Sequence, residues 1–311
     1  MPIVRTDPAP SAGDGLPPPP ESVLRALPRL VRWPNLLIML LSLVLVRGAL
    51  LLRGQPLAEV LAPRFGLLVL AALLVAAGGY IINDYYDVKI DAINRPDRLV
   101  VGRLLGRRKA MLAHVLLSGV GVGLAVLSGA GKRQAVLIGL VTLGAALLLW
   151  GYSARFKRVA LVGNISIGLL TAALVLLPEL QLLTGRKAVW LYALAAFFLT
   201  VVREIVKDIE DMRGDAQHGC RTLPLVWGVA RSKWVAGFFL VVLGGLVLSA
   251  VAQLPALGRW PLAAWLLALV VLPLAWLARL LWLADRRRHF RQLSAWCKGI
   301  MLAGVLSMLL A

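Results

Sequence analysis

The chain has 311 residues, of which 60% are hydrophobic, and its formal net charge is +19 at pH 7. Its mean hydropathy of +0.82 is far above that of a soluble globular domain and excludes that class. The 34 lysines and arginines fall in short clusters between apolar runs rather than along one basic face, so they do not indicate nucleic acid as a partner. We therefore expect an all-α integral membrane protein that contacts membrane lipids and no nucleic acid.

The first thirty residues differ in composition from the rest of the chain. They are rich in proline, including the run at 17–20, and they lack the apolar stretch and small-residue cleavage site of a signal peptide. We predict that residues 1–30 form a disordered cytoplasmic tail and that residues 31–311 form a single membrane domain.

Nine apolar windows follow this tail. Crossing a hydrocarbon core of about 30 Å takes roughly 20 helical residues, and each window comes close to that length. They lie near 34–52, 64–82, 110–130, 134–151, 159–183, 188–205, 234–255, 260–283 and 293–311. With the N-terminus in the cytoplasm, 26 of the 34 basic residues fall on inner segments and 8 on outer ones. This asymmetry predicts nine transmembrane helices with the N-terminus inside and the C-terminus outside.

Two inner segments hold nine of the 15 acidic residues. The sequence "NDYYDVKID" at 83–91 follows the second window, and "DIEDMRGD" at 208–215 follows the sixth. Both have the spacing DxxDxxxD, displaced by 124 residues, with the aspartates Asp84, Asp87, Asp91 and Asp208, Asp211, Asp215. On a helix each trio falls within about a 60° arc, so we expect each to face one point at the cytoplasmic end of helix two or six.

The chemistry of these trios indicates a bound cation. Three like charges on one face repel, and two such faces repel more strongly unless a positive species lies between them. Carboxylate oxygens suit hard divalent cations, and Mg²⁺ commonly shares its ligand positions with substrate phosphates. We therefore predict that the six aspartates bind a Mg²⁺-bound diphosphate. The alternative is a solvated face paired with nearby basic residues, and the occurrence of the spacing twice argues against it.

Other reactive residue types form no pattern. Cys220 and Cys297 lack the spacing of a disulfide framework or a metal site, so we interpret both as packing residues. His218 lies three residues after Asp215, and we interpret it as a solvated loop residue.

The two motifs, together with nine predicted spans, resemble the UbiA-type superfamily of intramembrane prenyltransferases. The resemblance covers nearly the whole chain after the tail. It implies a polyprenyl diphosphate donor, Mg²⁺ as cofactor, transfer of the prenyl chain to a lipid or phenolic acceptor, and an active site facing the cytoplasm of a bacterial or archaeal cell membrane. It also implies a set of substrate-binding residues beside the motifs: Asn83, Arg95, Arg98, Tyr152, Ser153, Lys157, Arg158, Arg203 and Lys207.

Some of these basic residues have a second interpretation. Arg203 and Lys207 could instead extend to the membrane interface, where long basic side chains keep their charge in water. Lys157 and Arg158 could serve only to set the orientation of the helices. The sequence leaves these alternatives open.

Within the superfamily, "REIVKDIEDMRGD", "GCRTLP" and "YSARFKR" look most similar to the geranylgeranylglycerol-phosphate geranylgeranyltransferase group. This similarity implies transfer of geranylgeranyl to geranylgeranylglyceryl phosphate, in ether-lipid synthesis. Such an acceptor requires a cationic site for its phosphate, for which Arg32, Lys157 and Arg158 are candidates. Two alternatives remain: an aromatic acceptor such as 4-hydroxybenzoate or another quinone precursor, and a cation transporter whose aspartates carry the ion.

Overall fold

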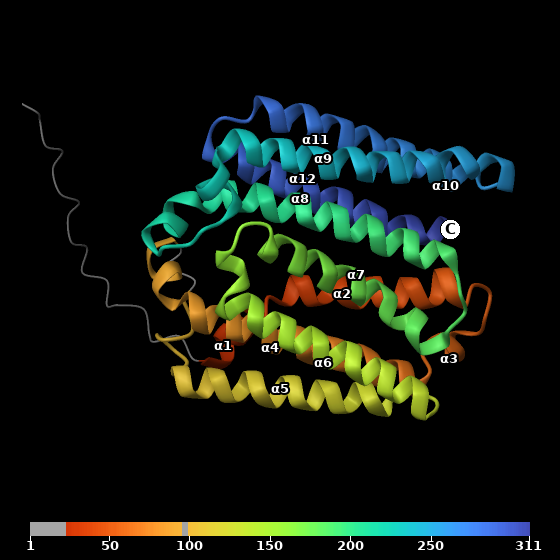
Figure 1. The fold of residues 1–311 in the computed structure, drawn as a ribbon. Helices are drawn as coiled ribbons and strands as arrows, with labels where there is room; N and C mark the ends of the chain where they lie inside the picture. The colour runs from red at the N-terminus through yellow and green to blue at the C-terminus, as the bar shows by residue number, and fades with distance from the viewer. Residues whose placement is uncertain (1–22, 95–98) are drawn as a thin grey trace, which may run out of the picture.

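The computed structural model describes residues 23–94 and 99–311, which form a helical bundle (Figure 1). Within these ranges nine helical spans are long and apolar enough to cross a membrane, which confirms the predicted number. The elements are α1 (Val23–Leu30), α2 (Trp33–Leu45), η1 (Val46–Leu51), α3 (Leu57–Val60), α4 (Pro63–Asn94), α5 (Arg107–Leu127), α6 (Lys132–Ala154), η3 (Phe156–Arg158), α7 (Val162–Leu182), α8 (Lys187–Gln217), α9 (Leu223–Gln253), η4 (Pro255–Leu257), α10 (Trp260–Leu266), η5 (Leu267–Val271), α11 (Leu272–Leu283), α12 (Arg287–Ser307) and η6 (Met308–Leu310).

The second and sixth spans are longer than the apolar windows that predicted them. The windows end at 82 and 205, whereas α4 continues to Asn94 and α8 to Gln217. Neither extension contains proline, and the apolar side chains between the acids are compatible with helix. Both acidic motifs therefore lie on the last turns of long continuous helices, which fixes the direction of their side chains.

The seventh and eighth spans are irregular for identifiable reasons. Helix α9 begins eleven residues before the predicted window and bends at Gly228, where φ is 80° and ψ is 162°. Glycine adopts such a positive φ without a steric penalty. The eighth span passes from α10 into α11 through the π-helical turn η5, immediately before Pro273, whose ring nitrogen cannot donate a helical hydrogen bond.

The predicted tail is partly ordered. Residues 1–22 lie outside the described residues, but residues 23–30 form α1 rather than continuing the tail. Ala26 and Leu30 are fully buried and pack in one apolar cluster with Ile81 of α4 and Ala110 of α5. These two contacts attach the start of the first span to the helix that carries the first acidic motif.

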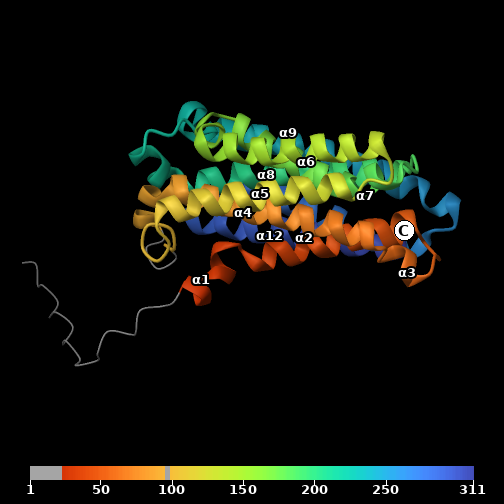
Figure 2. The ribbon, with the colours of Figure 1, turned by 90° about the horizontal axis from the view of Figure 1, so that it is seen from below.

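The helices lie side by side along one axis in both views (Figures 1 and 2). Helix α4 packs against α5 and α6, and α8 packs against α7, α9 and α12. Large apolar side chains remain exposed on the outer faces, including Leu112 and Leu116 of α5 and Phe238 and Val241 of α9. An apolar surface of this extent indicates contact with lipid, so the chain is an integral membrane protein.

Candidate functional site

The first acidic cluster lies on the last turns of α4. The Asp84 carboxylate accepts a hydrogen bond from the Arg32 guanidinium, with 3.0 Å between Nη2 and Oδ1. Asp87 accepts a bond from Asn83 Nδ2 at 2.9 Å, and its other oxygen contacts Lys157 Nζ. Two cations from distant parts of the chain therefore neutralise two motif aspartates.

Arg32 and Lys157 respond differently to this environment. Burial acts to lower the pKa of the Arg32 guanidinium, but the neighbouring Asp84 opposes burial and the net shift is upward. For Lys157, burial lowers the pKa of the ammonium despite the opposing attraction of Asp87. The attraction of the neighbouring aspartate therefore outweighs the effect of burial at Arg32 but not at Lys157.

The second acidic cluster occupies the equivalent turns of α8. Asp208 Oδ2 accepts a hydrogen bond from Asn164 Nδ2 of α7 at 2.8 Å. Asp211 forms ion pairs with Lys207, one helical turn earlier, at 3.3 Å and with Arg287 of α12 at 3.9 Å. About one turn before this cluster on α8, Arg203 pairs with Glu204, which is buried.

Tyr152 lies in electrostatic range of both clusters. Its hydroxyl interacts electrostatically with Asp87 of the first cluster and with Asp208 of the second. Asp215 of the second cluster also interacts with Asp87. The turn η3, which carries Lys157, is joined to the loop after α8 by a backbone bond of 2.9 Å from Arg221 N to Arg158 O. The structure therefore brings the two distant motifs into one acidic site.

The remaining predicted residues divide into three groups. Arg95 and Arg98 lie outside the described residues. Ser153 is buried, and its hydroxyl donates to the Leu149 carbonyl of its own helix at 2.9 Å, so the described structure gives it no contact with the acids. Asn83, Lys157, Arg203 and Lys207 contact carboxylates in or beside the clusters.

Three residues of this site were not included in the predicted set: Asn164, Arg287 and Arg32, which we had considered only for an acceptor phosphate. Asn164 has a signal in the sequence, because it is an amide in the first turn of α7 within a mainly apolar window, where polar side chains are costly. No sequence pattern indicates that Arg32 pairs with Asp84, 52 residues away.

In the described part of the chain, no three histidine, cysteine, aspartate or glutamate side chains converge closely enough to bind a metal ion as they stand. The carboxylates are instead occupied by Arg32, Lys157, Lys207 and two asparagine amides. Every one of these partners is a cation or a hydrogen-bond donor, so the site attracts positive charge. The carboxylate oxygens themselves are hard ligand atoms of the kind that Mg²⁺ prefers.

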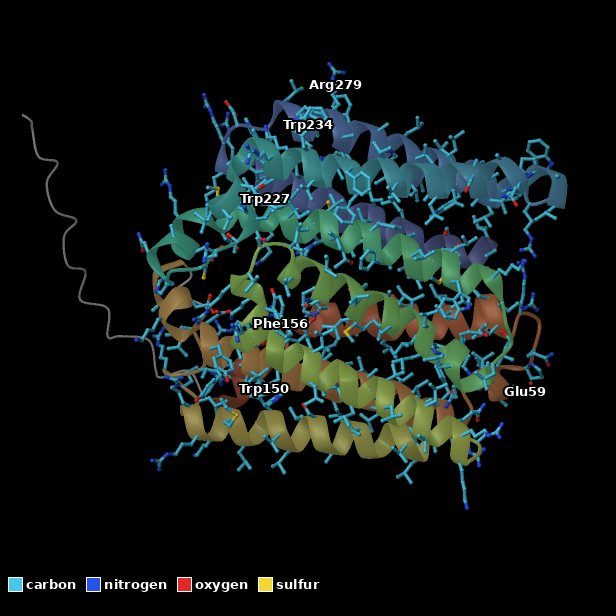
Figure 3. All side chains as sticks on the ribbon, viewed as in Figure 1. Glu59, Trp150, Phe156, Trp227, Trp234 and Arg279 are labelled. Carbon is cyan, nitrogen blue, oxygen red and sulfur yellow. The ribbon has the colours of Figure 1, made fainter. Side chains whose placement is uncertain are left out.

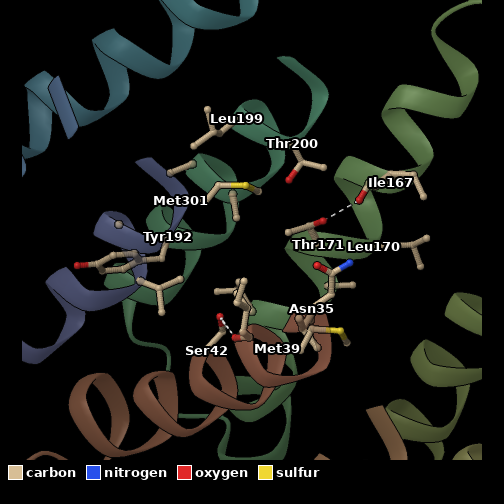
Figure 4. A pocket seen from close by; sticks show the side chains of 18 of the residues that line it. Asn35, Met39, Ser42, Ile167, Leu170, Thr171, Tyr192, Leu199, Thr200 and Met301 are labelled. Atoms are coloured by element: carbon tan, nitrogen blue, oxygen red, sulfur yellow. Dashed lines mark hydrogen bonds between the residues drawn. The ribbon is translucent and has the colours of Figure 1, made fainter. Parts of the chain in front are cut away.

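A cavity of about 390 Å³ lies inside the bundle, and none of the six motif aspartates is among its described lining residues. Its lining comes mainly from apolar residues of α2, α4, α6, α7, α8 and α12, some of which Figure 4 shows. Tyr80, one turn before Asp84, and Arg203, five residues before Asp208, line it near the acids. Tyr192 also lines it and lies sixteen residues before Asp208, or about 24 Å along a helix axis.

Polar contacts join the helices at the end of the bundle away from the acids. Tyr192 and Ser307 of α12 share a hydrogen bond of 2.7 Å between their hydroxyls. Arg47 is buried and donates to Gln181 Oε1 at 2.9 Å and to the carbonyls of Val60 and Glu59. Glu59 lies toward the opposite end of the bundle from Trp150 and Phe156 (Figure 3).

Together, the acids and the cavity can bind an amphiphile with a highly charged head and a long apolar tail. The carboxylates, through a cation, bind the head, and the apolar lining removes the tail from water.

Comparison with known proteins points the same way. Residues 42–300 match the profile of the UbiA prenyltransferase family. The chain is 35% identical to a digeranylgeranylglyceryl phosphate synthase of Methanopyrus kandleri over 241 residues, covering 76% of this chain and 82% of that protein. It is 34% identical to a protein of the same name from Thermococcus gammatolerans over 223 residues, covering 70% and 74%.

Solved structures share the fold. One from a study of digeranylgeranylglyceryl phosphate synthase in membranes has a TM-score of 0.68 at 22% identity and covers 92% of this chain and 99% of its own. A UbiA homologue from Archaeoglobus fulgidus, bound to DMAPP and Mg²⁺, has a TM-score of 0.60 at 16% identity, with 91% and 99% covered.

Proposed function

Since the chain belongs to the UbiA prenyltransferase family, we propose that it transfers a geranylgeranyl group from its diphosphate to geranylgeranylglyceryl phosphate, with Mg²⁺ as cofactor. The observation that carries this proposal is that the two acidic clusters lie on the last turns of α4 and α8, with Tyr152 in electrostatic range of both, beside an apolar cavity lined by Tyr80 and Arg203. Membership of a family of prenyl-transferring enzymes replaces the cation-transporter alternative.

The reaction replaces one C–O bond by another and transfers one proton. The C1–O bond of the donor breaks, and both electrons leave with pyrophosphate. The acceptor hydroxyl oxygen bonds to C1, forming an ether, and its proton passes to a motif carboxylate or to the departing pyrophosphate. Bound Mg²⁺ supplies charge neutralisation for the leaving group.

The residues of the chain have separate tasks in this reaction. The six motif aspartates would hold the cation, and Asn83 and Asn164 orient Asp87 and Asp208 by donating to them. Arg32 and Lys157 already lie beside Asp84 and Asp87, so each can exchange a carboxylate for a diphosphate oxygen when the donor binds. The positive charges of Arg32 and Lys157 would then stabilise the negative charge of the departing pyrophosphate.

The apolar cavity accounts for the donor's tail. A prenyl chain prefers hydrocarbon to water, and the cavity provides apolar surface from the level of Arg203 to that of Tyr192, about 16 Å along α8. The basic segments that predict the N-terminus inside also border the acidic site, so the proposed mouth faces the cytoplasm. The choice of glyceryl phosphate as acceptor is supported by the names of the relatives at 35% and 34% identity.

A transfer assay tests the proposal. Purified protein would receive radiolabelled geranylgeranyl diphosphate and Mg²⁺, with geranylgeranylglyceryl phosphate or 4-hydroxybenzoate as acceptor. We expect labelled ether lipid with the first acceptor, lost in Asp84→Asn and Asp208→Asn and retained in Asp285→Asn, an exposed carboxylate outside the site. Product with 4-hydroxybenzoate alone would reassign the acceptor. Failure to bind the diphosphate would contradict the role of the acidic clusters.

A further inference from the structure

A second cavity, of about 450 Å³, lies beside the acidic site and differs from it in charge. The described lining contains no carboxylate. It consists largely of basic and aromatic side chains: Lys89, Arg107, Arg158, His218, Tyr85 and Tyr86. Lys89 and Arg107 are exposed, so the cavity opens to solvent at the end of the bundle and a charged head group can enter.

This basic cavity shares its walls with the acidic site. On α4, Tyr86 directly precedes Asp87. In η3, Arg158 directly follows Lys157, whose ammonium contacts Asp87. After α8, His218 lies three residues beyond Asp215, and its Nδ1 donates to the Gly214 carbonyl oxygen at 2.9 Å. The basic cavity and the acidic site are therefore adjacent.

The cations of the two sites are in different states. In the acidic site, Arg32, Lys157 and Lys207 are paired with aspartates. In the basic cavity, none of the described residues forms an ion pair with Lys89 or Arg158. Arg158 Nε is buried, and it has no hydrogen-bond partner within the described structure. A basic residue that only sets the orientation of the helices in the membrane can keep its hydrogen-bond donors in water. The buried Nε of Arg158 therefore requires another explanation.

The remaining lining residues suit a phosphate. The Arg107 guanidinium lies over the Tyr85 ring, with its Cζ 4.4 Å from the ring centroid, a contact that stabilises the cation beside the cavity. The Tyr85 and Tyr86 rings meet edge to face at 5.1 Å. The described lining thus offers arginine guanidinium groups and tyrosine hydroxyls with no carboxylate among them. Such groups match a phosphate monoester in charge and in hydrogen-bond donors.

We propose that the basic cavity binds the phosphate monoester of the acceptor, while the acidic site binds the donor diphosphate. This inference rests on the proposed function and names the second substrate's subsite. It explains how one enzyme distinguishes two phosphorylated lipids: the donor binds to carboxylates through a cation, and the acceptor binds to cations directly. Of the three residues predicted for the acceptor phosphate, Arg158 is retained, whereas Arg32 and Lys157 are assigned to the donor.

Paired acceptors test this assignment. Transfer would be measured with geranylgeranylglyceryl phosphate and with the same lipid lacking its phosphate, for Arg158→Gln and Lys89→Gln and for Arg108→Gln as control. Arg108 is an exposed neighbour of Arg107 that is absent from the described lining. We expect KM for the phosphorylated acceptor to rise about tenfold or more in the first two variants, as for loss of a charge-assisted hydrogen bond. The KM for the acceptor without phosphate, divided by the KM for the phosphorylated acceptor, should fall by the same factor. The KM for the donor should stay unchanged. Arg158→Lys should restore part of the affinity.

Direct binding separates failure of the cavity from failure of the proposed function. Labelled geranylgeranylglyceryl phosphate would be bound to wild type and variants without donor. Binding that is lost in the variants, without any transfer by wild type, would retain the cavity and overturn the function. Transfer with the same KM change for both acceptors, or with none, would overturn the cavity. Equal competition by phosphatidic acid vesicles would reassign it to a membrane lipid head group.

Discussion

Replacement of Asn164 by leucine tests whether the second acidic cluster depends on a residue outside the motif. Asn164 is buried and donates to Asp208 at 2.8 Å, the one described contact that joins α7 to the motif of α8 through a side chain of each. Leucine has a similar size and no donor, so the substitution removes the hydrogen bond with little change in packing. Asp208 then loses the contact that fixes its orientation.

The magnitude follows from the charge of the acceptor. A hydrogen bond to a charged group contributes about 1.5–3 kcal/mol. That range corresponds to a roughly 10- to 150-fold change in an equilibrium constant. If Asp208 must hold its orientation to bind the cation, we expect the half-saturating Mg²⁺ concentration for prenyl transfer to rise by this factor.

The assay is a Mg²⁺ titration of prenyl transfer at saturating donor. The control is Ser166→Ala, because Ser166 is also buried on α7 but donates only to the Val162 carbonyl of its own helix, at 2.7 Å. Thermal unfolding of both variants in detergent separates loss of fold from loss of the site. A titration curve for Asn164→Leu that coincides with that of Ser166→Ala would refute the role assigned to Asn164.

Three further predictions follow from other contacts. Removal of divalent cations with EDTA should abolish transfer and excess Mg²⁺ should restore it, measured by labelled product; activity that survives EDTA would contradict cation binding by the acids. Tyr192→Ala should increase use of donors longer than geranylgeranyl diphosphate in competition assays, since it removes a ring from the end of the cavity, whereas Ser307→Ala removes only the hydroxyl contact and should not. Gln181→Leu should destabilise the protein by about 2–3 kcal/mol, because the buried Arg47 guanidinium keeps its charge but loses one hydrogen-bond acceptor. Activity per folded molecule should stay near that of wild type. Unchanged thermal unfolding in detergent would count against this prediction.

Much of the architecture could be read from local composition. The apolar windows gave the correct number of spans because a helix must satisfy its own backbone hydrogen bonds in lipid, and this requires a long apolar stretch wherever the chain crosses. The same method placed the ends of α4 and α8 too early, at 82 and 205, because hydropathy marks where the lipid contact ends and not where the helix ends. The start of α1 was missed for a related reason: Ala26 and Leu30 gain their burial from distant helices.

The sequence by itself determined that this is a membrane protein of helical spans, and its repeated aspartate spacing predicted that the acids are the centre of its chemistry. Tertiary structure alone decided which groups meet those acids. Arg32 reaches Asp84 across 52 residues, Lys157 reaches Asp87 across 70, and Asn164 reaches Asp208 across 44. Spacing along a helix records which side chains share one face, because the helix repeats regularly. It carries no information about which other helix packs against that face, and that packing divides the cations between an acidic site and a separate basic cavity.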